Sequence, residues 1–163
     1  MRTKDKRILD ILEDINKNKK KVSSLGIELK KVTIKDFNIN LKDENRNSLK
    51  IITVTPTLIR HLEGYWRGLG LKEQDVLESI ENNLKKKSEF FNKKTLKGNL
   101  IKSIRTLNKH PISVKSHNNT YLCDKYEIEF NNRSDLEYIL SIAFNYGIGE
   151  QNARGLGYVE FIK

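Results

Sequence analysis

The chain has 163 residues, enough for one domain or one and a half, and should bury a hydrophobic core that is stable without disulfide bonds or structural metal ions. The single cysteine, Cys123, excludes an internal disulfide framework and a four-cysteine zinc site, and no apolar run approaches the length that spans a bilayer. Thirty-one Lys and Arg against 21 Asp and Glu give a net charge of +10, which favours a polyanionic partner. We therefore expect a cytoplasmic protein with no membrane partner.

The basic excess is concentrated in two segments. Residues 1–35 carry eleven basic and five acidic side chains, and residues 85–109 carry nine basic and one acidic. Such clustering is typical of a phosphate-binding surface. The alternative is that the lysines are solvated helix ends that offset the helix macrodipole.

In chain order, the apolar pattern first predicts an amphipathic helix over residues 5–17. Apolar and polar residues then alternate over residues 27–41, with one slip that indicates a bulge or a break. The β-branched segment 48–60 predicts a strand, and Pro56 places it at a sheet edge or marks the strand's exit. A helix is predicted over residues 72–91.

The second half continues with strands at residues 100–107 and 112–115, and one at 121–130 whose register shifts near Asp124. A helix capped by Ser134 or Asn132 follows, Gly147 ends it, and residues 156–162 form the last strand. From residue 48 onward, the order strand, helix, strand, strand, helix, strand predicts an α+β ferredoxin-like fold with a split βαβ topology. The predicted domains are residues 1–47 and residues 48–163.

Two Gly-x-Gly pairs lie five residues apart in GIGEQNARGLG, residues 147–157, in a chain with nine glycines. The segment leads from a helix into a strand, so it fits neither a P-loop nor a dinucleotide fingerprint. One interpretation is helix capping plus turn geometry. The other is that the backbone approaches a ligand and offers bare N–H groups as anion contacts, with Arg154 among them.

This segment resembles the glycine-rich loop of the RAMP superfamily of CRISPR-associated proteins. The segments TPTLIR, DVLESIENNLKKK and YEIEF make the chain similar to the repeat-processing endoribonuclease of that superfamily. The resemblance implies two ferredoxin-like halves, with residues 1–47 as a partial N-terminal half. It also implies metal-independent cleavage of CRISPR repeat RNA by attack of the ribose 2′-hydroxyl, with no cofactor.

The family's catalytic histidine normally lies in the first half, and this chain has no histidine before His61. Three interpretations therefore stay open. The chain is an endoribonuclease, a catalytically inert RNA-binding relative that acts as a subunit or mimic in a CRISPR complex, or a plain ferredoxin-like interaction module.

The candidate base is His61, because Arg60 and Arg67 flank it and Tyr65 and Trp66 are available for base stacking. Histidine and cysteine spacings match no metal site. The expected partner is RNA, either the CRISPR repeat hairpin or its single-stranded flank, and a homodimer or other CRISPR subunits are possible partners. The candidate RNA-binding residues are Lys85, Lys86, Lys87, Lys93, Lys94, Lys97, Lys102, Arg105, Lys109, Gly147, Gly149, Arg154, Gly155 and Gly157.

Overall fold

The computed structural model describes residues 49–61, 64–116 and 119–162. All of them belong to one compact unit of the chain, Leu41–Lys163. The predicted helix at 5–17, the strands at 27–41 and the partial N-terminal half lie outside the described residues.

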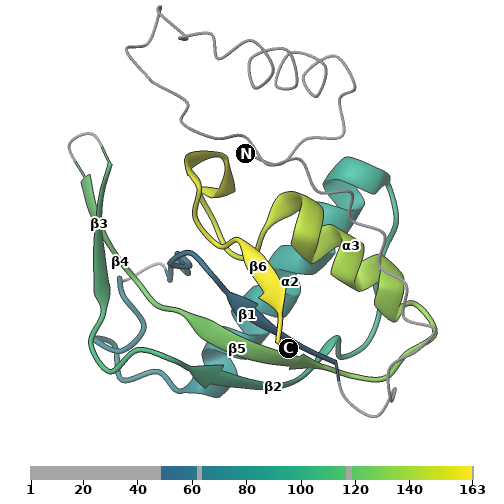
Figure 1. Ribbon diagram of the computed structural model, residues 1–163, viewed down its shortest axis with the longest axis horizontal. Helices are drawn as coiled ribbons and strands as arrows, with labels where there is room; N and C mark the ends of the chain where they lie inside the picture. Colours follow the sequence, from purple (N-terminus) through teal and green to yellow (C-terminus); the bar gives the residue numbers. More distant parts are fainter. Residues whose placement is uncertain (1–48, 62–63, 117–118, 163) are drawn as a thin grey trace, which may run out of the picture. The chain divides into compact units, whose positions relative to one another are not determined.

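Four strands form an antiparallel sheet in the order β2-β5-β1-β6 (Figure 1). They are β1 (Leu49–Thr53), β2 (Ile101–Thr106), β5 (Tyr126–Phe130) and β6 (Val159–Phe161). Helices α2 (Glu73–Asn92) and α3 (Leu136–Tyr146) both lie on one face of this sheet. This order and layering are those of a ferredoxin-like domain, so the predicted fold class is confirmed.

The sheet has one buried face and one charged face, as the alternation in β5 shows. Tyr126, Ile128 and Phe130 are buried beneath the helices, whereas Glu127 and Glu129 point to the helix-free face. Neighbouring strands keep this register, because Ile51 of β1 lies opposite Ile128. Period-two alternation thus places the apolar set on the face that the helices cover.

Helix α2 forms where the periodicity predicts it. At its start, Asp75 Oδ2 accepts a hydrogen bond from the backbone N–H of Lys72 at 2.8 Å. At its end, Lys93 adopts a left-handed conformation with φ of 54°. The helix packs against β2 and α3, and α3 packs against β6. The core side chains that these contacts bury completely include Ile51, Val76, Ile80, Leu84, Leu100, Ile128, Ile139, Leu140, Ile148 and Val159.

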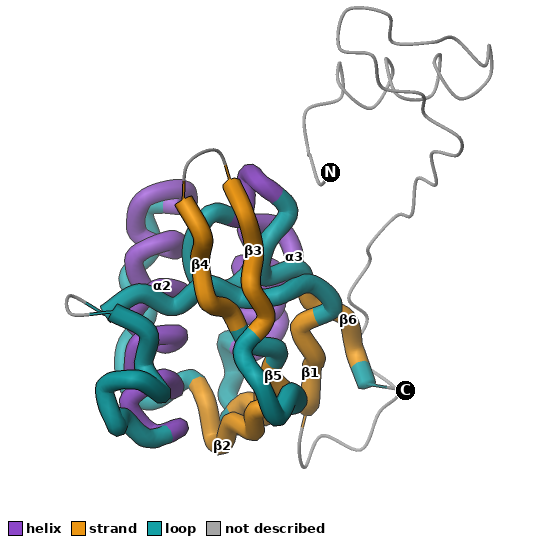
Figure 2. Tube along the Cα trace, turned by 90° about the vertical axis from the view of Figure 1, so that its left-hand side faces the viewer, coloured by secondary structure: helices purple, strands orange, loops and turns teal. Residues whose placement is uncertain are grey.

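A second, two-stranded sheet is inserted between β2 and β5. Strands β3 (Ile112–Ser116) and β4 (Asn119–Cys123) form a hairpin that stands away from the main sheet (Figure 2). Leu58, Cys123 and Leu156 form a small buried cluster at its base, against which Val114 and Tyr121 pack. The hairpin is therefore fixed to the segment after β1 and to the loop before β6.

Three details of the prediction are wrong. The strand expected at residues 121–130 is two strands in different sheets, because backbone hydrogen bonds tie Asp124 to Thr57 between them. The strand expected over residues 48–60 ends at Thr53, and of the two alternatives for Pro56 the structure confirms the strand's exit, because β1 is a central strand. The residue at the N-terminus of α3 is Asp135, not Ser134 or Asn132, whereas Gly147 ends this helix as predicted.

Candidate nucleic-acid interface

The glycine-rich loop, residues 147–157, folds back on the protein through its own backbone. Gly147 N–H donates to Ala143 O at 2.9 Å, and Ile148 N–H donates to Gly157 O at 2.8 Å. Gly157 N–H donates to Pro56 O at 2.9 Å, so the loop is also fastened to the exit of β1. The N–H groups of Gly149 and Gly155 donate as well, to Asn83 Oδ1 and Asn152 O.

Steric contact explains why two of these positions are glycine. A Cβ atom on Gly157 would lie 1.8 Å from Ile148 O, and one on Gly149 would lie 2.5 Å from Leu58 O. Both residues have positive φ, 67° and 73°. The backbone therefore approaches other protein backbone here. The expectation that the four glycines keep bare N–H groups for a ligand is wrong, because internal acceptors use all four.

Lys87 of α2 holds the same loop from the helix side. Its Nζ donates to Gly147 O and Gly149 O at 2.8 Å and to Asn152 Oδ1 at 2.7 Å. Burial lowers the pKa of Lys87 to about 7, while the charge of Glu150 acts in the opposite direction. The structure thus turns this lysine, predicted as a phosphate contact, toward the carbonyl oxygens of the loop.

Two asparagines that the sequence reasoning missed complete this arrangement. Asn152 Nδ2 donates to Ile148 O at 3.0 Å and to Leu156 O at 2.8 Å, which closes the loop across its base. Asn83 lies one helical turn before Lys87 on α2, and both side chains contact Gly149. The spacing of Asn83 and Lys87 beside the apolar stripe of α2 is the signal that could have found them.

The part of the loop that faces solvent is its tip. A short 3₁₀ turn, η2 (Asn152–Arg154), forms it, and Ala153 and Arg154 are exposed. At the start of the turn, the Arg60 guanidinium forms an ion pair with Glu150. Arg154 is therefore the candidate residue of this loop that the structure presents to solvent.

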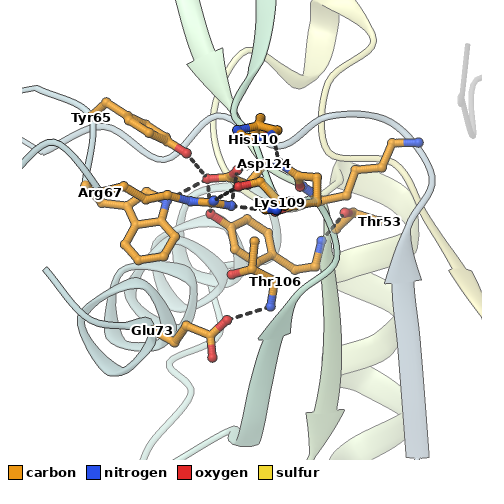
Figure 3. A network of polar contacts seen from close by, with 12 residues as sticks. Thr53, Tyr65, Arg67, Glu73, Thr106, Lys109, His110 and Asp124 are labelled. Atoms are coloured by element: carbon orange, nitrogen blue, oxygen red, sulfur yellow. Dashed lines mark hydrogen bonds and ion pairs between the residues drawn. The ribbon is translucent and has the colours of Figure 1, made fainter.

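A buried carboxylate, Asp124, organises the aromatic segment GYWRGLG (Figure 3). Its Oδ2 accepts hydrogen bonds from Tyr65 Oη at 2.6 Å and Trp66 Nε1 at 2.7 Å. Its Oδ1 accepts from Arg67 at 2.7 Å and from Asn108 Nδ2 at 2.6 Å. Desolvation by burial is the main cause that raises the pKa of Tyr65, and its hydrogen bond to Asp124 adds to it.

Asp124 changes how two predicted stacking residues are interpreted. Trp66 is 7% exposed and Tyr65 is tied by its hydroxyl, so the prediction that both rings are available for base stacking is wrong for Trp66. Arg67 also donates to the carbonyl oxygens of Lys109 and Asn108, at 2.7 and 2.9 Å. The segment therefore joins the β2–β3 connection to the β4–β5 connection.

His61, the predicted base, lies just before this segment. Its Nε2 is buried and has no hydrogen-bond partner among the residues that the structure describes. Neither flanking cation is directed at it, because Arg60 pairs with Glu150 and Arg67 with Asp124. His110 is exposed in the β2–β3 connection, and His117 lies outside the described residues.

The structure does not bring the nine predicted cations of residues 85–109 onto one surface. Lys102 and Arg105 lie on the helix-free face of the sheet, where they pair with Glu129 at 2.6 Å and Glu127 at 2.5 Å. These contacts lower the pKa of both carboxyl groups. Lys85 pairs with Glu81, and Lys87 holds the glycine-rich loop. Among these nine, the cations that are exposed and form no ion pair within the described ranges are Lys86, Lys93, Lys94, Lys97 and Lys109.

The sequence predicts no segment that spans a membrane, and the helices of the structure bear on this prediction. None of those in the described part of the chain combines the length and apolar character needed to cross a bilayer.

The strand order, the two covering helices and the glycine-rich loop between α3 and β6 define a ferredoxin-like domain of the RAMP type. The family model described as CRISPR associated protein Cas6, C-terminal, matches residues 39–161. The chain belongs to this family.

Several solved structures share this fold. A CRISPR associated protein Cas6 is 22% identical with a TM-score of 0.52, over 71% of this chain and 48% of that protein. A RAMP protein described as binding different RNA substrates is 15% identical with a TM-score of 0.62, over 99% of this chain and 67% of that one. A Cas6-related protein from Pyrococcus furiosus is also 15% identical, with a TM-score of 0.61, over 99% and 66%.

The chain spans about half the length of the first of these structures and about two-thirds of the other two. At these identities the likeness shows the fold. No curated protein matches the chain.

Proposed function

We propose that the chain binds CRISPR repeat RNA and takes part in its processing. The observation that carries this proposal is membership of the Cas6 family over residues 39–161. The net charge of +10 supports it, because a basic protein attracts a polyanion and releases its counterions on binding.

The proposed RNA contacts are the side chains that the fold leaves in solvent. Unlike Lys102 and Arg105, the lysines among them form no ion pair within the described residues, so their charge remains available to a phosphate group. The glycine N–H groups already have acceptors, so we assign the loop a positioning role, with Arg154 at its tip as the contact. The remaining proposed contacts are Lys86, Lys93, Lys94, Lys97 and Lys109.

The proposed cleavage forms a bond between the ribose 2′-oxygen and the adjacent phosphorus and breaks the bond to the 5′-oxygen. It yields a 2′,3′-cyclic phosphate and a free 5′-hydroxyl, so it needs a base, an acid and a cation near the phosphate. His61 is the proposed base. General acid–base catalysis of this kind contributes about 10²- to 10⁴-fold in rate.

One observation favours a second candidate function, an RNA-binding relative that does not cleave by its own residues. The Nε2 atom of His61 is buried, whereas a base must come within hydrogen-bond distance of the 2′-hydroxyl. Such a protein would hold repeat RNA as a subunit or mimic within a CRISPR complex.

The purified full chain, incubated in EDTA with repeat RNA from its own genome, separates these possibilities. Retention of the RNA at physiological salt supports the proposal, and no retention overturns it in favour of a plain interaction module. A 2′,3′-cyclic phosphate product identifies the endoribonuclease, whereas bound but intact RNA identifies the inert relative. If cleavage survives in the His61→Ala variant, the base assignment is wrong.

A further inference from the structure

The C-terminal end of helix α2 carries aromatic side chains that the core does not use. Phe90 is 70% exposed and Phe91 is 52% exposed, more than any other large hydrophobic side chain in the described part of the chain. The two rings contact each other, with centroids 4.9 Å apart, and exposed apolar groups that adjoin one another mark interaction sites more often than scattered ones do. They are not the aromatic residues that the sequence reasoning selected.

These rings are held in place by neighbouring contacts. Phe91 stacks on Tyr146 of α3, with ring centroids 4.3 Å apart and an interplanar angle of 6°. Tyr146 Oη donates to Asn92 Oδ1 at 3.2 Å, and Asn92 Nδ2 donates to Tyr138 Oη, also at 3.2 Å. Asn92 thus links the two tyrosines, so a ligand would meet rings that are already oriented. Such preorganisation lowers the entropic cost of binding.

Cations surround the rings. Lys94 Nζ lies 3.9 Å from the centroid of Tyr138, and Lys93 Nζ lies 5.6 Å from that of Phe90. Lys86 lies one turn before Phe90 on the same face of α2, and Lys97 follows the helix. We call the set of Phe90, Phe91, Tyr138, Tyr146, Lys93 and Lys94 the aromatic–lysine surface.

The charge of this surface selects its partner. Within residues 85–97, Lys85 pairs with Glu81, and Lys87 donates hydrogen bonds to the glycine-rich loop. The segment has one acidic residue, Glu89, and four further lysines: Lys86, Lys93, Lys94 and Lys97. A second copy of the chain would bring the same positive charge against itself. A polyanion with flat apolar groups satisfies both the lysines and the rings, and unpaired RNA is such a molecule, whereas a duplex hides its base faces.

We propose that the aromatic–lysine surface binds unpaired nucleotides of RNA, with a base stacked on Phe90 and the flanking phosphates contacted by Lys93 and Lys94. This inference rests on the proposed function and assigns it a single-stranded substrate region. Tyr146 directly precedes Gly147, so this surface borders the glycine-rich loop.

The test measures the affinity of the full chain for two RNAs, a single-stranded oligoadenylate and a blunt duplex with the same number of phosphates. Loss of one stacked base costs single-strand affinity about 5- to 150-fold, so Phe90→Leu should show this loss and leave duplex affinity nearly unchanged. Phe90→Trp should restore the affinity. Ile162→Ala, another exposed apolar residue, is the matched control and should bind as the wild type does.

The lysines give an independent readout. The double variant Lys93→Gln, Lys94→Gln should reduce the slope of log affinity against log salt by about 0.7 for each phosphate that is no longer neutralised. Unchanged single-strand binding by Phe90→Leu, while the wild type still retains repeat RNA, overturns this inference and leaves the proposed function standing. A wild type that retains repeat RNA but does not bind the single-stranded oligoadenylate also overturns this inference alone, whereas a wild type that retains no repeat RNA overturns the proposed function and this inference with it. If Phe90→Leu instead converts a dimer into a monomer with unchanged RNA affinity, the surface is a self-association interface and the inference is wrong.

Discussion

The glycine-rich loop and the end of helix α2 meet at Tyr146 and Gly147, yet their polar groups are used in opposite ways. In the loop, backbone N–H groups and the ammonium of Lys87 are directed at acceptors within the protein. At the end of α2, Lys93 and Lys94 lie over exposed rings. In a sequence, a glycine-rich segment and a group of lysines look equally suited to bind a ligand. The structure uses the N–H groups of the four glycines internally, whereas Lys93 and Lys94 are exposed to solvent.

The first way to break this comparison is to add a methyl group inside the loop. Gly157→Ala places Cβ against Ile148 O, and overpacking plus left-handed strain should lower the free energy of unfolding by about 3–5 kcal/mol. Gly155→Ala is the matched control, because it has positive φ but nothing within 4 Å of the new Cβ, and should lose only about 1–2 kcal/mol. Urea denaturation measures both, and equal losses would show that contact does not explain the glycine.

A second test concerns the aromatic residues that the fold ties down. Asp124→Asn puts an amide donor among side chains that all donate to this carboxylate, so the free energy of unfolding should fall by about 2–3 kcal/mol. Asp135→Asn removes a partly exposed ion pair with Arg133 and should change the stability by less than about 1 kcal/mol. A tolerated Asp124→Asn would mean that the network does not hold Tyr65 and Trp66.

A third test uses the pH dependence of Lys87. In the folded chain the pKa of Lys87 is lowered to about 7, and on unfolding it returns toward 10.5. Between these values the unfolded state binds more protons, so the free energy of unfolding should rise with pH by up to about 1.4 kcal/mol per unit. Below pH 7 both states are protonated and this contribution is constant.

Lys87→Met should remove that rise, so the difference in stability between the variant and the wild type should change between pH 7 and 9. Lys86→Met on the same helix is the control, because Lys86 is exposed. A difference that stays constant over this range would show that Lys87 is not buried as described.

The smallest expected effect on stability belongs to the exposed cations. Lys86→Gln and Lys97→Gln should each leave the free energy of unfolding within about 0.5 kcal/mol, because neither forms an ion pair within the described residues. Each should nonetheless weaken repeat-RNA binding and lower its salt dependence. Lys102→Gln removes a lysine that is paired with Glu129 and should weaken RNA binding less. An equal loss of affinity in all three variants would contradict the distinction between cations that form ion pairs and cations that do not.

Much of the fold follows from periodicity alone. The apolar stripe of Val76, Ile80 and Leu84 locates α2, and alternation in YEIEF locates β5, because both patterns report one buried face. The order of elements then allows the ferredoxin-like topology. The pattern shows a register shift near Asp124 but could not show that the strand ends there, because the buried carboxylate has five polar partners, most of them far away in the sequence.

The site was harder to predict, because sequence reports residue types and not their directions. Within the run Lys85, Lys86 and Lys87, helical phase sends each lysine to a different environment: an ion pair, solvent and the loop. Trp66 beside Arg67 indicates stacking, but its indole N–H donates to a residue 58 positions away. Long-range contacts of this kind leave no local pattern.

Hydrogen exchange of the backbone amides, measured on the full chain with and without its repeat RNA, tests the central claim most directly. We expect slow exchange at residues 147–149 and 157 in the free chain, because these amides already donate to protein acceptors, and RNA-induced slowing in peptides that cover residues 86–97. Fast exchange of the glycine-rich loop in the free chain, with slowing on RNA binding confined to that loop, would contradict the account.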